Sequence, residues 1–119
     1  MARPLDVLRS CAFYPAFYGG SVGIVLAAFI LLMLGSERRF RIAVHAWSGW
    51  HRLCAKWLLG QHVRIEGTLP DGPVLIAVKH ESFFEAIDLP TLLALPVVFA
   101  KAELLRIPVW GRAGERYGL

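Results

Sequence analysis

The chain has 119 residues, of which 56% are hydrophobic and only 18% are charged. Soluble globular chains carry roughly 25% charged residues, so this composition excludes a disordered tail and argues against a freely soluble domain. The two cysteines, Cys11 and Cys54, are too few for a disulfide framework and form no Cys-x-x-Cys pair that could bind zinc.

The first predicted element is a long apolar helix near the N-terminus. No Asp, Glu, Lys or Arg occurs in the 27 residues from Ser10 to Ser36. A bilayer core requires roughly 20 apolar residues in a helix, so we predict a membrane helix over residues 11–34. It either spans the bilayer or enters one leaflet. A cleaved signal peptide is the competing interpretation, but Met33-Leu34-Gly35-Ser36 places large residues where a cleavage site needs small ones.

The second predicted element is a basic amphipathic helix over residues 37–59, followed by Gly60 as a helix stop. Apolar residues recur in it at three- and four-residue steps, and basic residues occupy the other side. Such a helix lies either in the bilayer interface or in the core of the following domain. The apolar positions are Phe40, Ala43, Val44, Trp47, Trp50, Cys54, Trp57 and Leu58.

The net charge of +4 is compatible with anionic lipid or with nucleic acid. Arg38, Arg39 and Arg41 follow directly on the apolar segment, which favours lipid. By the positive-inside rule this side faces the cytoplasm. We therefore expect a membrane protein whose residues after the apolar segment face the cytoplasm, with membrane lipids as partners and no nucleic acid.

The pattern changes to that of an α/β domain after Gly60. Residues 62–66 alternate polar and apolar, and residues 74–78 and 97–100 are short apolar runs typical of buried strands. Helical material lies between the two runs, so the segment predicts a βαβ unit with a largely parallel sheet. We expect a membrane-associated helical region over residues 1–60 and a partial α/β domain over residues 61–119, because 59 residues are too few for a complete one.

The candidate chemistry lies at the end of the strand predicted over residues 74–78, where ligands of α/β sheets bind. His80 can act there as a general base, and a carboxylate from Glu85 can orient its ring. The two side chains meet only if His80 precedes the helix. Ser82 and Glu85 fit the capping box S-x-x-E, which places the helix start after His80. Alternatively, Glu85 only caps the helix and His80 is a structural residue.

Residues 79–85, KHESFFE, resemble the His-x4-Asp/Glu block of the glycerolipid acyltransferases, and specifically of the bacterial 1-acylglycerol-3-phosphate (lysophosphatidate) acyltransferases. Residues 99–111, FAKAELLRIPVWG, resemble the second block of that family, K-x-E-L-x-x-x-P-x-x-G. Both blocks occur in the family's order behind a membrane-associated helix pair.

The resemblance implies transfer of a fatty acyl group from acyl-CoA or acyl-acyl-carrier protein to the sn-2 hydroxyl of lysophosphatidic acid, which yields phosphatidic acid. His80 would be the base and Glu85 its orienter, and neither a metal nor a further cofactor is expected. The second block would help to bind the acceptor, with Lys101 contacting phosphate. Its matching residues are Lys101, Glu103, Leu104, Pro108 and Gly111.

The sequence departs from the family pattern in two places. Glu85 stands where Asp is usual, and the third block, of the E-G-T-R type, is missing. We therefore expect an N-terminal fragment that is weakly active or inactive on its own. Two alternatives remain open: an acyltransferase for another lysolipid such as lyso-ornithine lipid, and a non-catalytic membrane-associated module.

Overall fold

The computed structural model describes residues 3–79, 81–94, 96–108 and 110–118, and this part of the chain consists of helices and coil. The described helices, in chain order, are α1 (Pro4–Met33), α2 (Glu37–Cys54), the π-helix η1 (Ala55–Leu59), α3 (Phe83–Leu92), α4 (Ala102–Leu105) and α5 (Trp110–Tyr117).

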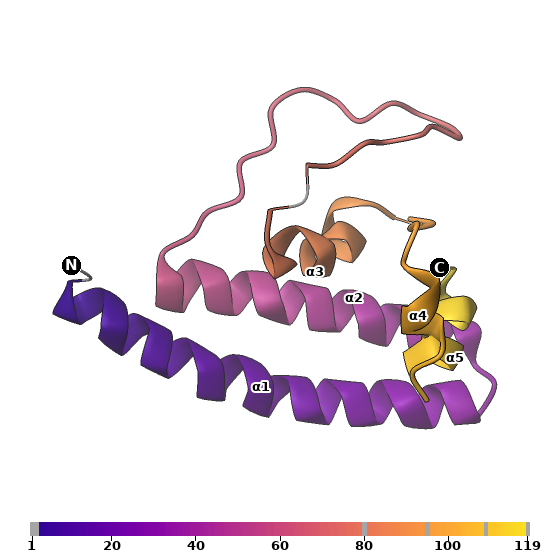
Figure 1. Cartoon of the computed structure of the whole chain (residues 1–119), viewed down its shortest axis with the longest axis horizontal. Helices are drawn as coiled ribbons and strands as arrows, with labels where there is room; N and C mark the ends of the chain where they lie inside the picture. Colours follow the sequence, from indigo (N-terminus) through magenta and orange to yellow (C-terminus); the bar gives the residue numbers. More distant parts are fainter. Residues whose placement is uncertain (1–2, 80, 95, 109, 119) are drawn as a thin grey trace.

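Helices α1 and α2 form an antiparallel hairpin (Figure 1). Pro4 occupies the first turn of α1, where its missing N–H costs no hydrogen bond. The chain reverses after Met33 through Gly35, which has a left-handed φ of 70°. The helices approach closely, because a Cβ on Gly20 would lie 2.3 Å from Nε1 of Trp50. Trp47 Nε1 also donates a hydrogen bond to Ser21 Oγ across the hairpin, at 3.0 Å.

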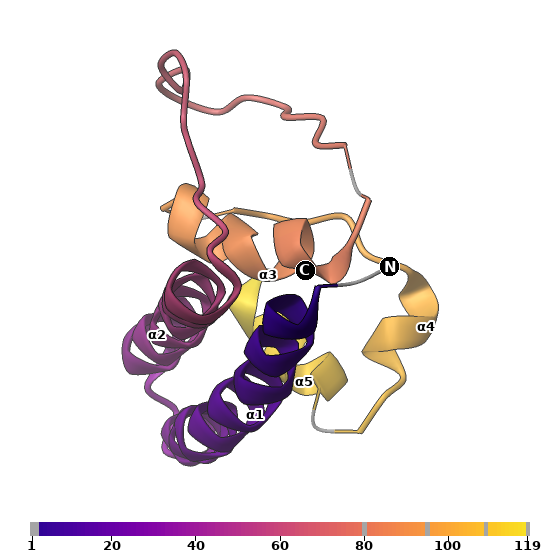
Figure 2. The same ribbon diagram turned by 90° about the vertical axis from the view of Figure 1, so that its left-hand side faces the viewer.

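The second helix ends as the sequence predicts. The last five residues before Gly60 form the π-helix η1, and Gly60 then adopts a left-handed φ of 72°. Helix α2 contacts both α1 and α3 (Figure 1), and Figure 2 shows α3 lying above the pair of helices α1 and α2. Phe40, Ala43 and Cys54 of the predicted apolar face are buried in the helical assembly, whereas Trp57 in η1 is 71% exposed. Contact of this segment with a bilayer interface stays a prediction.

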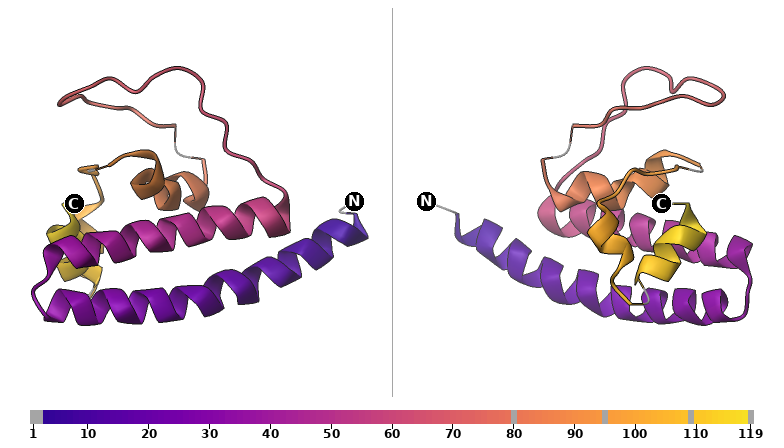
Figure 3. Two further views of the ribbon diagram at one scale, coloured as in Figure 1. Left: turned by 180° about the vertical axis from the view of Figure 1, so that it is seen from behind. Right: turned by 45° about the vertical axis from the view of Figure 1, so that its right-hand side comes forward.

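The two views of Figure 3 show α5 beside the end of the hairpin where α1 turns into α2. Ala113 and Tyr117 of α5 pack there against a small core formed by Ala28, Phe40 and Ala43. This contact joins the C-terminal part of the chain to the start of α2.

The predicted α/β fold is wrong, because the described residues contain no strand and no sheet. Residues 61–79 form an extended loop that stands away from the helices (Figure 1), and residues 97–100 are coil. A strand needs a partner for its backbone hydrogen bonds, and none of these segments pairs with another. Their apolar side chains consequently stay uncovered, with Leu75 87% and Phe99 92% exposed.

Helix α1 is long and apolar enough to cross a membrane, judged by length and composition. Only 17% of its most apolar 18-residue window is buried, whereas the core helix of a soluble protein is mostly buried. Most of its uncovered apolar residues from Tyr14 onward recur at three- and four-residue steps and lie on one outward side. We call this set the outer stripe of α1: Tyr14, Tyr18, Val22, Val25, Leu26, Phe29 and Met33.

Candidate functional site

The N-terminus of α3 carries the capping box that the sequence predicts. Ser82 is the N-cap in an extended conformation, and its Oγ accepts a hydrogen bond from Phe84 N at 3.2 Å. Glu85 Oε2 accepts hydrogen bonds from Ser82 N and from Ser82 Oγ, both at 2.9 Å. These contacts turn the Glu85 carboxylate back toward the chain that precedes the helix.

His80 lies outside the described residues, so the proposed His80–Glu85 dyad stays a prediction. One condition for the dyad is met in the described part of the chain. Helix α3 begins at Phe83, and Ser82 is its N-cap. Position 80 therefore lies two residues before the N-cap, outside the helix. On one continuous helix, side chains five residues apart would point in directions about 140° apart.

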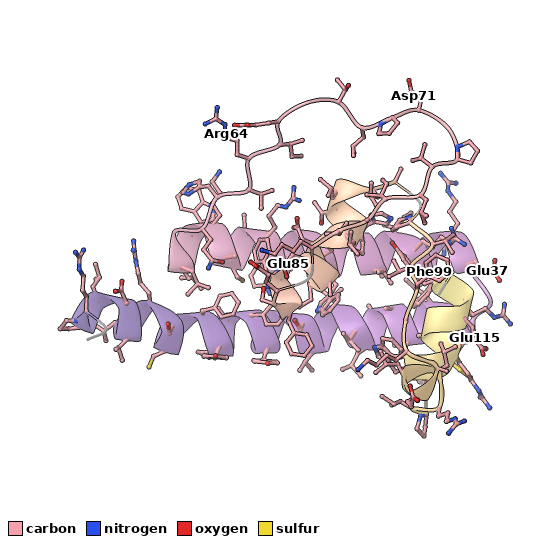
Figure 4. The ribbon with its side chains drawn as sticks, turned by 45° about the horizontal axis from the view of Figure 1, so that its top comes forward. Glu37, Arg64, Asp71, Glu85, Phe99 and Glu115 are labelled. Carbon is pink, nitrogen blue, oxygen red and sulfur yellow. The ribbon has the colours of Figure 1, made fainter. Side chains whose placement is uncertain are left out.

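An open cavity of about 430 Å³ lies at this helix start. Ser82, Phe84 and Glu85 contribute one wall, and the beginning of the loop after Gly60 contributes the other. The lining side chains from that loop are Gln61, His62 and Val63. Figure 4 labels Glu85 at the start of α3, in front of the hairpin. The carboxylate that the sequence singles out therefore borders a space that a small polar group can enter.

The second block forms a separate local structure. Lys101 is the N-cap residue of the short helix α4, and Glu103 lies in its first turn. Leu104 is partly exposed, and Pro108 is exposed in the connection to α5. Gly111 is buried in α5, where a Cβ would lie 1.9 Å from the carbonyl oxygen of Leu105, so only glycine fits this contact between α4 and α5.

The structure does not place the second block at the start of α3. Helices α4 and α5 pack on each other near the turn between α1 and α2, whereas α3 begins farther along α2 (Figure 1). Lys101 is exposed. Its assignment as a phosphate contact stays a prediction.

Two polar contacts fix α3 on α2. Arg52 forms a bidentate ion pair with Asp88, with Nε–Oδ1 and Nη2–Oδ2 distances of 2.7 and 2.5 Å. One turn earlier on α2, the fully buried hydroxyl of Ser48 donates to the carbonyl oxygen of Ile87 at 2.6 Å and lies 2.5 Å from Thr91 Oγ1. Together they hold the helix that begins with the capping box in one position on the hairpin.

His51 fills the space between α1 and the start of α3. Its ring is 5% exposed and lies 5.1 Å from the rings of Phe17 and Phe84, measured between centroids. Its Nδ1 has no hydrogen-bond partner in the described structure. Burial lowers the pKa of His51, and the nearby Asp88 carboxylate opposes that shift without cancelling it. His51 is therefore a neutral packing residue near pH 7.

Lowering the pH from about 7 to about 5 should destabilise the fold through His51. Its pKa is lowered from the ordinary value of 6.5, so the unfolded chain takes up the proton more readily than the folded chain. The stability that neutral His51 contributes is complete above 6.5 and declines as the pH falls below that value. Thermal unfolding in detergent, followed by circular dichroism, should show a smaller pH dependence for His51→Phe. Equal pH dependence of both proteins would contradict this assignment.

Sequence reasoning missed the contacts between α2 and α3. It assigned Ser48 and Arg52 only to the side of the helix opposite the apolar positions and gave no role to His51 or Asp88. One pattern could have indicated the contacts: Ser48 and Arg52 are four residues apart, and Asp88 and Thr91 are three apart, so each pair lies on one helix face. An acid in the interior of the apolar helix 83–92 also calls for a partner.

Comparison with family models, with curated proteins and with solved structures finds no match for this chain. Within the described residues there is also no group of three or more His, Cys, Asp or Glu side chains that could hold a metal ion. The family resemblance therefore rests on the two sequence blocks alone.

Proposed function

We propose that this chain belongs to an acyltransferase that moves a fatty acyl group from acyl-CoA or acyl-acyl-carrier protein to the sn-2 hydroxyl of lysophosphatidic acid. The product is phosphatidic acid. The observation that carries the proposal is the capping box at the start of α3, because the helix begins only after position 80 and the Glu85 carboxylate turns back onto Ser82, toward the chain that precedes the helix. The adjoining cavity gives the acceptor hydroxyl a place to approach.

In the proposed reaction, the imidazole of His80 takes the proton of the acceptor hydroxyl. The resulting oxygen attacks the thioester carbonyl, and the thiolate leaves with the proton returned from the imidazolium. Glu85 stabilises the imidazolium and holds the ring in the tautomer that can accept the proton. Its hydrogen bonds to Ser82 restrict the carboxylate to one orientation, which supports a positioning role.

The proposed location is the cytoplasmic face of a bacterial inner membrane. The outer stripe of α1 is available for contact with lipid tails. Helix α2 runs beside α1 and carries the Arg52–Asp88 pair together with α3. If α1 stood across the bilayer, this charged contact would enter the hydrocarbon, which costs several kcal/mol per charge. We therefore propose that the hairpin lies along one leaflet.

A transfer assay tests the proposed function. Membranes containing the protein are incubated with labelled acyl-CoA or acyl-acyl-carrier protein and with lysophosphatidic acid, lyso-ornithine lipid or no acceptor. The assay is run on the 119-residue chain and on any longer gene product that contains it. His80→Ala is the control, which should reach the membrane in equal amount and show no transfer above background.

Each other outcome of this assay has a distinct meaning. Acylation of lyso-ornithine lipid alone would show that this lipid, and not lysophosphatidic acid, is the acceptor, while the proposed acyl transfer itself would stand. Absence of transfer to every acceptor by the longer gene product as well would leave the non-catalytic module as the better account. Loss of folding in His80→Ala, rather than loss of transfer, would indicate a structural histidine.

A further inference from the structure

We infer that one end of the molecule binds the headgroups of anionic lipids. This basic end consists of residues 33–42, 106–108 and 110–117, and it holds six arginines and two glutamates. The rest of the chain holds seven Lys or Arg and seven Asp or Glu, so the whole net charge of +4 resides at this end. The arginines are Arg38, Arg39, Arg41, Arg106, Arg112 and Arg116.

The fold brings these arginines together from two distant segments. Arg116 of α5 pairs with Glu37 at the start of α2, with an Nη1–Oε1 distance of 2.8 Å. Arg112 lies one turn before Arg116 on the same face of α5. Tyr117 packs beside α2, and its ring lies 6.3 Å from that of His45. Figure 4 shows Glu37 and Glu115 at this same end of the molecule.

The basic end also exposes apolar side chains. Leu34 and Met33 at the tip of the hairpin are 73% and 69% exposed, and Ile42, Ile107 and Trp110 are also uncovered. Met33 is also the last residue of the outer stripe of α1. The exposed apolar side chains of the basic end are therefore continuous with that stripe, which is available for contact with lipid tails. Arginines beside exposed apolar residues match a bilayer interface, where phosphates lie directly above acyl chains.

The apolar residues decide between lipid and nucleic acid. A nucleic acid would contact the arginines through its phosphates but would leave the apolar hairpin tip and Trp110 in water. A bilayer with anionic lipids would contact the arginines through its headgroups and also bury these apolar side chains. Each arginine at an anionic surface raises binding about fivefold, equivalent to about 1 kcal/mol. This inference concerns lipid binding alone and does not depend on acyl transfer.

Vesicle binding tests the inference. The full chain is mixed with vesicles of phosphatidylcholine, and with vesicles in which about a third of the lipid is anionic phosphatidylglycerol. The double variant Arg112→Gln/Arg116→Gln should bind the anionic vesicles about 30-fold less tightly than the wild type and leave binding to neutral vesicles unchanged. Raising the salt concentration should abolish most of the difference between the two vesicle types.

The matched control is Arg64→Gln/Lys79→Gln, which removes the same charge from two exposed residues of the loop 61–79. It should change binding by less than about twofold. A second variant, Arg38→Gln/Arg39→Gln, keeps the Arg116–Glu37 pair and should behave like the α5 double variant if the basic end is the binding surface. Circular dichroism checks that all variants keep the wild-type helix content.

Three results would overturn the inference. One is equal loss of binding in the α5 variant and in the loop control, which would show that only net charge matters. Another is equal binding of the wild type to neutral and anionic vesicles. The third is release of the chain from anionic vesicles by duplex DNA at the same phosphate concentration, which would identify nucleic acid as the partner.

Discussion

Replacing Arg52 by alanine should lower the free energy of unfolding by about 3–5 kcal/mol. The change leaves the Asp88 carboxylate, whose side chain is only 8% exposed, without its cation in the contact between α2 and α3. An unpaired buried charge is among the largest single-residue penalties in a fold. Because α3 is held to the hairpin mainly through this pair and the Ser48 contacts, we expect its detachment to accompany the loss.

Replacing the partner, Asp88, by alanine should lower the free energy of unfolding by less, about 1–2 kcal/mol. Asp88→Ala leaves the Arg52 side chain unpaired, but that side chain is 28% exposed and water can hydrate part of the guanidinium. The double variant Arg52→Met/Asp88→Leu should recover most of the stability, because it removes both charges and keeps apolar contact. Denaturant titration in detergent, followed by circular dichroism, measures all three variants. Equal costs for both single variants would contradict a desolvated carboxylate.

Local patterns predicted the helical half of the molecule well. Two patterns identified the two helices of the hairpin: the absence of charged residues over residues 10–36, and the spacing of apolar residues after Glu37. Such patterns suffice because a helix makes its backbone hydrogen bonds within one segment. The Gly60 stop and the Ser82 cap are equally local, because each depends on residues within one turn. The main error at the N-terminus is the start of α1, which the uncharged segment placed at residue 11 although the helix begins at Pro4.

The predicted sheet failed because strand pairing is not a local property. Residues 74–78 and 97–100 have the composition of buried strands, yet a strand is stable only when another segment accepts its hydrogen bonds. In the described chain these residues remain extended and exposed instead. Ser48, Arg52 and Asp88 were missed for a related reason: the pattern of each helix does not indicate a polar partner on another helix, and only the packing of α2 on α3 brings these residues together.

Glu85→Gln should lower the rate of acyl transfer by about 10²–10⁴-fold while leaving the helix cap in place. Glutamine at this position can still accept the hydrogen bond from Ser82 N with its side-chain carbonyl, so α3 keeps its capping box. An amide cannot stabilise an imidazolium as a carboxylate does. The rate is measured in the same membrane assay that tests the proposed function, in the gene product that shows transfer.

Ser82→Ala is the matched control, because it removes the side-chain cap and the hydrogen bond from Ser82 Oγ to Glu85 but keeps the carboxylate and its hydrogen bond from Ser82 N. It should cost about 1 kcal/mol of stability and change the transfer rate by only a few-fold. Glu85→Asp should retain more transfer than Glu85→Gln, since Asp keeps the negative charge at a slightly shorter reach. If Ser82→Ala and Glu85→Gln instead lose transfer in proportion to their loss of helix, the Glu85 carboxylate serves only to begin α3, and the dyad is wrong.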